Sequence, residues 1–204
     1  SLDYLVARHE VLRTALPSEQ GEPWQQIVES LRVELPLEDL SALEPASQQA
    51  ALTEKIAAVV KAPFDLQAPP LIRAALFRLA PETHVLALAL HHIAVDDWSF
   101  GLLVDDLAQA YTAFSTDSQP ELAPLTLQYA DFAAWQRQHV SGAFRQQQLD
   151  YWRTQLAGCA PGLTLPGFRR NTADVTQPAE RYRRELPKPV SEALQRQAEQ
   201  SGST

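Results

Sequence analysis

The order of strand and helix patterns in this chain of 204 residues predicts an α+β or α/β fold with a mixed sheet. Two apolar runs, 71–79 and 84–93, flank the short turn Pro81-Glu82-Thr83, which predicts an antiparallel hairpin. Apolar residues recur at helical spacing on both sides of the hairpin, in 46–61 and 98–114. We therefore expect a sheet that is flanked by helices.

Proline and glycine punctuate the first part of the chain, so only short elements are expected before the helix over 46–61. That helix should end before Pro63, because proline removes a backbone donor and disfavours a helical residue before it. In chain order, the earlier patterns predict a helix over 3–13 that ends near Arg13, an extended segment from Leu16, and short strands over 24–28 and 33–37.

Helical patterns dominate the chain after the hairpin. Asp96 or Asp97 can cap the helix that starts near Trp98, because a carboxylate accepts hydrogen bonds from the free amides of the first turn. A loop over 115–126 follows. The remaining patterns predict helices over 129–139 and 143–156, a surface segment over 157–178, a strand over 182–186 and a helix over 189–200.

The composition is that of a globular protein without a nucleic-acid partner. Apolar residues make up 45% of the chain, and the formal net charge of −8 lacks the basic surface that phosphates require. No apolar run is long enough to cross a bilayer, and no signal peptide opens the chain. The single cysteine, Cys159, excludes an internal disulfide, so a reducing, cytoplasmic location is expected.

The stretch His91-His92-Ile93-Ala94-Val95-Asp96-Asp97-Trp98-Ser99 is the candidate site. Two histidines end an apolar strand, and an acidic pair then begins a helix. A strand that delivers an imidazole to its end presents a general base on a rigid element. A histidine after a strand is also often a structural group, and the pair alone does not decide between these interpretations.

Four separated segments of the chain, one of which is this stretch, have the order and spacing of the motifs of one family. They are Arg8-His9-Glu10-Val11-Leu12-Arg13-Thr14, Pro63-Phe64-Asp65-Leu66 with Pro70-Leu71-Ile72-Arg73-Ala74, the His91–Ser99 stretch, and Tyr129-Ala130-Asp131-Phe132-Ala133-Ala134-Trp135-Gln136 followed by Tyr151-Trp152. These resemble the RHExLRT, PFDL..PPLxRA, HHxxxDGWS, YxDFAxWQ and YWxxxLAG patterns of nonribosomal peptide synthetase condensation domains. The resemblance covers essentially the whole chain.

The resemblance implies an α+β fold, a two-layer α/β sandwich like one lobe of chloramphenicol acetyltransferase, with a mixed sheet flanked by helices. Residues 1–204 would be the amino-terminal lobe of a condensation domain, cut at both ends, with the chain from about residue 187 leading toward a second lobe. The family's active site lies in a tunnel between the lobes. We therefore expect the isolated lobe to be inactive.

The implied reaction of the family is amide formation. The amine of an aminoacyl thioester attacks an acyl or peptidyl thioester, and carrier domains present both on phosphopantetheine arms. Carrier proteins and adjacent synthetase domains are thus the expected partners, with no bound cofactor, no nucleic acid and no membrane. The thioester supplies the driving force, so the protein mainly supplies position.

The resemblance assigns catalysis to His92, which matches the family's second histidine. An imidazole with a pKa near about 6.5 could accept the amine proton, or it could only orient the nucleophile and stabilise the tetrahedral intermediate. We expect His91 to point to the other side of the strand and to make a structural hydrogen bond. Asp96 is expected to hold the loop by pairing with an arginine, either Arg13 or one from the second lobe.

Asp97 stands where the family has glycine. Its carboxylate suits a helix start, but it narrows the tunnel and places charge near the thioester. The related X-domains of glycopeptide synthetases show HRxxxDD, and they recruit tailoring oxygenases instead of condensing. This chain has their second Asp but keeps His92, so a non-catalytic recruiting module is the alternative. A coenzyme A-dependent acyltransferase would share HxxxD but should lack the first and last motifs.

Structural interpretations compete for the remaining residues. Trp98 and Ser99 fit a helix start, and Trp98 is most simply a core residue. Core packing is also the default for Tyr129, Trp135, Tyr151 and Trp152. One basic group of arginines stands out on this acidic chain. It is either a solvated face or a binding surface for an acidic carrier-protein helix or its phosphate arm. The group comprises Arg169, Arg170, Arg181, Arg183 and Arg184. No metal site is expected, because adjacent histidines on a strand point to opposite faces.

Overall fold

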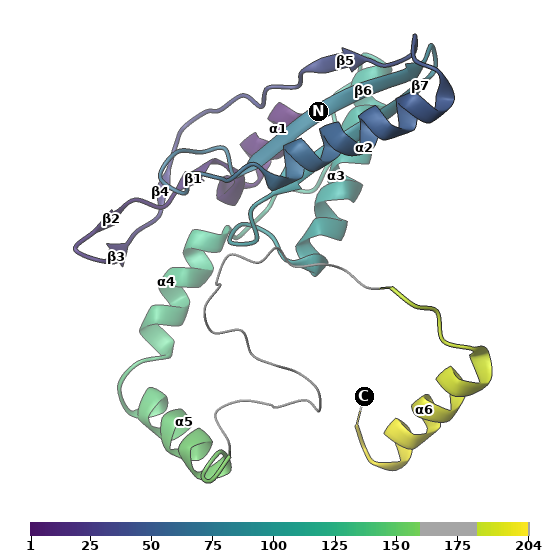
Figure 1. The fold of residues 1–204 in the computed structure, drawn as a ribbon. Coiled ribbons are helices and arrows are strands. Elements are labelled where there is room, and N and C mark those ends of the chain that lie inside the picture. Colours follow the sequence, from purple (N-terminus) through teal and green to yellow (C-terminus); the bar gives the residue numbers. More distant parts are fainter. Residues whose placement is uncertain (160–182, 204) are drawn as a thin grey trace. The chain divides into compact units, whose positions relative to one another are not determined.

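The computed structural model describes residues 1–159 and 183–203 (Figure 1). The chain divides into two compact units, 1–154 and 155–204. The first unit contains the sheet, and the second contains helix α6 (Lys188–Gln200). Most of the predicted surface segment over 157–178 lies outside the described residues, as do Arg169, Arg170 and Arg181.

A mixed sheet of three strands forms the centre of the first unit. The strands lie in the order β5 (Leu37–Asp39), β6 (Ile72–Ala80) and β7 (Thr83–Leu90). β5 runs parallel to β6, and β6 and β7 form an antiparallel hairpin in which Ile72 pairs with Leu90. The predicted hairpin and the predicted mixed sheet are both confirmed.

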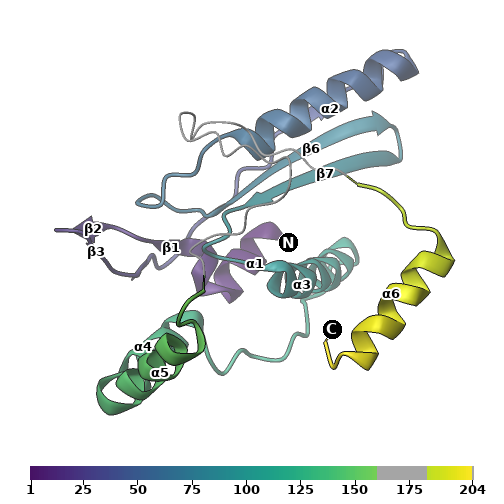
Figure 2. The same cartoon turned by 60° about the horizontal axis from the view of Figure 1, so that its bottom comes forward.

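Helices cover both faces of the hairpin. Both faces carry apolar side chains, because the strands are mostly apolar along their length and successive strand residues point to opposite faces. The face with Ile72 packs against α1 (Leu2–Arg8) and α3 (Asp97–Ser115). The face with Ala75 packs against α2 (Pro45–Lys61). Figure 2 shows α2 on one side of the hairpin and α1 with α3 on the other. The second helical face adds a third layer to the expected two-layer sandwich.

The first part of the chain differs from expectation at several points. His9 is extended (φ −101°, ψ 98°), so the predicted helix over 3–13 is divided into α1 and the 3-10 helix η1 (Glu10–Arg13). Two small ladders follow, formed by β1 (Thr14–Ala15) with β4 (Gln26–Ile27), and by β2 (Ser18–Glu19) with β3 (Glu22–Pro23).

The predicted strand over 33–37 is wrong, because pairing with β6 begins only at Leu37, which lies opposite Leu76. The Val33 amide instead donates to Asp3 Oδ1 over 2.8 Å. Residues 183–186 form no strand either, although the patterns predicted one over 182–186.

The later helices agree closely with the predicted ranges. α4 spans Tyr129–His139 and α5 spans Gly142–Gln155. In the described ranges, no helix is both long enough and apolar enough to cross a membrane.

Candidate functional site

The two histidines lie in a turn directly after β7, since the strand ends at Leu90 and does not reach Ile93. The His91 amide donates to the Leu71 carbonyl over 3.1 Å, and the His91 carbonyl accepts from the Ala94 amide over 2.9 Å. These two hydrogen bonds hold the turn at His91, where it leaves β7, and at Ala94, where it closes. His92 is exposed there and makes no hydrogen bond to any described residue.

His91 makes the structural hydrogen bond that we expected, since its Nδ1 accepts from the Ile93 amide over 3.1 Å. Its imidazole also meets the Phe64 ring edge to face, with centroids 5.9 Å apart. The expected alternation of the two histidines across a strand does not apply, because both lie beyond the last residue of β7.

Arg73 connects Phe64 to the end of α2. Its guanidinium donates to the carbonyls of Val59, Ala62 and Pro63 over 2.9, 3.0 and 2.9 Å. The last carbonyls of a helix lack partners within the helix, and its negative end favours a cation. The same guanidinium lies 4.4 Å from the centroid of the Phe64 ring. The second motif thus places Phe64 against the histidine turn.

Asp96 caps α3. Its Oδ1 accepts from the Ser99 hydroxyl over 2.6 Å and from the Ser99 amide over 2.8 Å. These two hydrogen bonds favour the charged carboxylate and hold the pKa of Asp96 below its ordinary value of 3.8, and the nearby His92 lowers that pKa further. Asp97 is the first residue of α3 and not its cap.

Arg13, one of the two arginine partners considered for Asp96, does not pair with it in this structure. Arg13 instead donates to the Val28 carbonyl and pairs with Glu10 Oε1 at 3.3 Å. The Asp96 carboxylate is already occupied at the start of α3, so it does not need a cation from the same chain. Arg13 therefore ties η1 to the end of β4, away from the histidine turn.

Trp98 is not a core residue, because 82% of its surface is exposed. It lies five positions before the buried Leu103, which is about 140° around the helix at 3.6 residues per turn. The expected core packing of the later aromatics is also wrong, since about half of each side chain is exposed on helices without a buried residue. These are Tyr129, Trp135, Tyr151 and Trp152.

His92 borders two clefts. The larger, of about 400 Å³, is lined by η1, α3 and the start of α4, and its residues include His9, Leu102, Leu125, Leu127, Gln128 and Tyr129. The smaller, of about 170 Å³, is lined by the end of β7 together with Asp97 and Phe100. Asp97 borders only the smaller cleft. A further cleft of about 540 Å³ lies against β3 and α4 and does not include His92.

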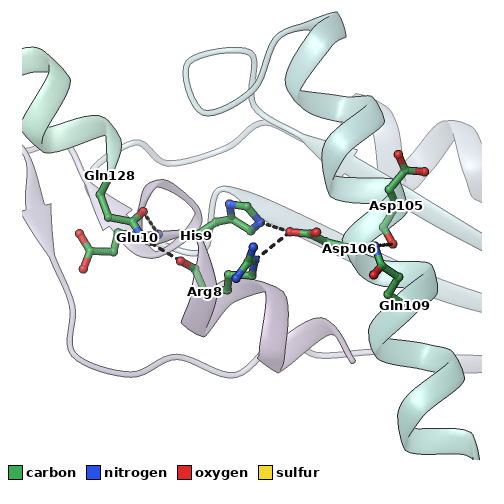
Figure 3. A network of polar contacts seen from close by, with 7 residues as sticks. All are labelled: Arg8, His9, Glu10, Asp105, Asp106, Gln109 and Gln128. Carbon is green, nitrogen blue, oxygen red and sulfur yellow. Dashed lines mark hydrogen bonds and ion pairs between the residues drawn. The ribbon is translucent and has the colours of Figure 1, made fainter. Parts of the chain in front are cut away.

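A polar network connects α3, the junction of α1 with η1, and the residue before α4 (Figure 3). His9 and Gln128 of this network line the larger cleft. Asp106 Oδ2 of α3 contacts Arg8 Nε at 2.9 Å and His9 Nε2 at 2.8 Å. The Gln128 amide group donates to the Arg8 carbonyl over 3.0 Å and accepts from the Glu10 amide over 3.2 Å. Sequence reasoning missed both Asp106 and Gln128. The available signal for Gln128 was its position directly before a predicted helix.

In residues 1–159 and 183–203, no three side chains of His, Cys, Asp or Glu are grouped closely enough to hold a metal ion.

Comparisons with known proteins agree with one another. A family model for the condensation domain matches residues 1–204. The phosphinothricin tripeptide synthetase PhsC of Streptomyces viridochromogenes is 40% identical over 204 residues, which cover 100% of this chain and 19% of that protein. A linear gramicidin synthase of Brevibacillus parabrevis is 38% identical over 204 residues, with 100% and 3% covered. The chain thus spans only a small part of these curated relatives.

A solved structure is similar to the chain in both sequence and fold. It is a complex of the X-domain and OxyB from teicoplanin biosynthesis. The similarity has a TM-score of 0.69 and 33% identity, and it covers 81% of this chain and 36% of that chain.

Proposed function

The chain belongs to the condensation-domain family, and from this premise we propose that it forms one wall of an amide-forming site in a nonribosomal peptide synthetase. In the proposed reaction, the amine of an aminoacyl thioester attacks the carbonyl carbon of a second thioester. A C–N bond forms, the C–S bond breaks, and the thiol leaves with the proton that the amine loses. Both thioesters are substrates carried by the phosphopantetheine arms of partner carrier domains.

The exposed imidazole of His92 is the observation that supports this proposal most strongly. It lies on a turn held from both sides, at the border of two clefts, and no described side chain competes for its nitrogens. His92 can therefore accept the amine proton and return it to the departing thiolate. An imidazole carried on an ordered turn can also orient the amine, and orientation is the larger part of catalysis when the thioester is already activated.

His91 and Asp96 support this arrangement without touching the reacting atoms. His91 closes the turn through the Ile93 amide, and Asp96 fixes the start of α3 through Ser99. The turn is thus held between an ordered strand end and an ordered helix start. In the proposed domain, the second lobe completes the tunnel, and this chain alone is inactive.

Asp97 favours a second candidate function, a non-catalytic module that recruits a tailoring oxygenase. The chain is similar to the X-domain that forms a complex with OxyB, and a carboxylate occupies the position of the family's glycine. This candidate predicts a complete two-lobed domain that forms no amide and binds an oxygenase of its own pathway.

A condensation assay on the complete two-lobed domain with loaded carriers tests both candidates. We expect amide product from wild-type protein and a loss of about 100-fold or more in rate for His92→Ala. His84→Ala is the matched control, because His84 is an exposed histidine on β7 that lines none of the three clefts. The enzyme proposal is wrong if wild type forms no product, or if His92→Ala condenses at the wild-type rate.

A further inference from the structure

We propose that Gln128 is a positioning residue that sets the width of the larger cleft beside His92. This proposal rests on the proposed function, because it concerns which substrate group that cleft admits. Gln128 stands one residue before α4, and it touches two segments that the chain separates widely. Its side chain contacts the backbone of Arg8 and Glu10, 120 and 118 positions away.

Gln128 provides hydrogen-bond partners for backbone groups at the break between α1 and η1. His9 is extended there, so the neighbouring Arg8 carbonyl and Glu10 amide point out of the helical pattern. The carboxamide of Gln128 donates to the first over 3.0 Å and accepts from the second over 3.2 Å. Both bonds need a group with a donor and an acceptor side by side, which glutamate and methionine lack.

The main chain of Gln128 is fixed as well. Its amide donates to Asp131 Oδ2 over 2.8 Å, which is the half of a capping box that reaches back to the residue before the helix. Leu127 and Tyr129, on either side, both line the cleft beside His92. Leu127 is 73% exposed, so its own contacts do little to hold it in place. The position of this wall therefore depends on the bonds of Gln128.

The opposite wall belongs to the same network. Asp106 anchors the Arg8–His9 junction to α3 at 2.9 and 2.8 Å, as Figure 3 shows. α3 carries Leu102 and Leu103, which also line the cleft. Arg8, Asp106 and Gln128 thus set the separation of the two walls. This coupling gives a physical role to Arg8 and His9 of the first motif and to Asp131 of the last motif, which holds the Gln128 amide.

Apolar side chains form most of this cleft, so its width should decide how large an apolar substrate group fits beside His92. A wall that moves freely admits large and small groups alike. Loss of the Gln128 bonds should therefore reduce discrimination between substrates by size. The ratio of two kcat/KM values measures discrimination and does not change with the fraction of protein that is folded.

The test compares carriers loaded with leucyl and alanyl groups in the complete two-lobed domain. We expect Gln128→Met, which keeps the length but loses both bonds, to move the leucyl-to-alanyl ratio of kcat/KM toward one by about tenfold. Gln138→Met is the matched control, since Gln138 is exposed on α4 and its side chain makes no hydrogen bond to a described residue. An unchanged ratio in Gln128→Met overturns the proposal.

Hydrogen exchange separates this proposal from the proposed function. In Gln128→Met, the amides of Glu10 and of the first turn of α4 should lose protection, and they should not in Gln138→Met. If wild type forms no amide, the proposed function fails, and exchange alone then decides the positioning role. Unchanged exchange overturns that role in either case. Faster exchange with an unchanged ratio would leave Gln128 as a purely structural residue and also overturns the proposal.

Discussion

The ring of Phe64 meets the imidazole of His91 edge to face, with centroids 5.9 Å apart and ring planes at 87°. The same ring lies under the Arg73 guanidinium, which is bonded to the end of α2. His91 in turn accepts from the Ile93 amide. A continuous series of contacts thus connects the end of α2 to the turn that carries His92.

Phe64→Leu should loosen this turn, because it removes both the aromatic pair and the cation–π contact. We expect the free energy of unfolding to fall by about 1–2 kcal/mol, measured by urea denaturation. The condensation rate of the complete domain should fall with it. Phe64→Tyr keeps the ring and serves as the control. Equal stability of the two variants would show that the ring contacts are unimportant.

Asp106→Ala should destabilise the chain by about 2–3 kcal/mol, because it leaves the guanidinium of Arg8 and the imidazole of His9 without their shared partner. All three side chains are largely buried, with 14–18% of each exposed. Thermal or urea unfolding measures the change. Asp105→Ala is the matched control, since Asp105 is exposed on the same helix and should change stability by about 0.5 kcal/mol or less. Similar losses for both variants would contradict the role assigned to the network.

Asp96 should make stability depend on pH at the acid end. Its folded-state pKa lies below the ordinary value of 3.8, so its charged form stabilises the fold above that pH. The contribution is lost as pH falls through the folded-state pKa. Asp96→Ala should therefore lower the melting temperature at neutral pH, and the difference from wild type should shrink below pH 3.8. Asp97→Ala is the control, because Asp97 does not cap α3. If Asp97→Ala lowers the melting temperature by the same amount and with the same pH dependence, the assignment of this effect to the Asp96 cap is wrong.

Elements with long, local apolar patterns could be predicted closely from sequence. α4 has the predicted bounds, Tyr129–His139, and α2 begins one residue early at Pro45. The parallel strand β5 could not be placed, because its partner β6 lies far along the chain and only that pairing selects its residues. Trp98 was misplaced because hydrophobicity alone does not show which side of α3 meets the sheet.

The same difference between local patterns and long-range contacts decides which parts of the candidate site could be predicted. The motif order pointed to the turn that carries His92, and the local cap formed by Asp96 was one of two options read from sequence. The partner of Arg13 and the roles of Asp106 and Gln128 depend on tertiary neighbours. The contact between Arg8 and Asp106 spans 98 positions, and no periodic pattern in a single sequence reports such a pair.

Asp97→Gly should show whether the departure from the family pattern limits catalysis. Asp97 borders the smaller cleft together with His92, so its carboxylate acts on groups that approach the imidazole from that side. The carboxylate opposes the negative charge that develops on the thioester carbonyl oxygen as the amine attacks. Removal of one exposed charge near that oxygen should lower the barrier by about 1 kcal/mol, which corresponds to roughly a fivefold rise in kcat/KM for condensation.

Asp97→Asn separates charge from width in the same assay, because it keeps the size of the side chain and removes only the charge. Equal gains for Gly and Asn would identify the charge as the obstacle, whereas a gain for Gly alone would identify the narrowed cleft. If neither variant condenses faster than wild type, Asp97 does not limit the reaction. If wild type and both variants form no amide while the domain binds a tailoring oxygenase, the carboxylate belongs to a recruiting module, and His92 is then retained there without its catalytic role.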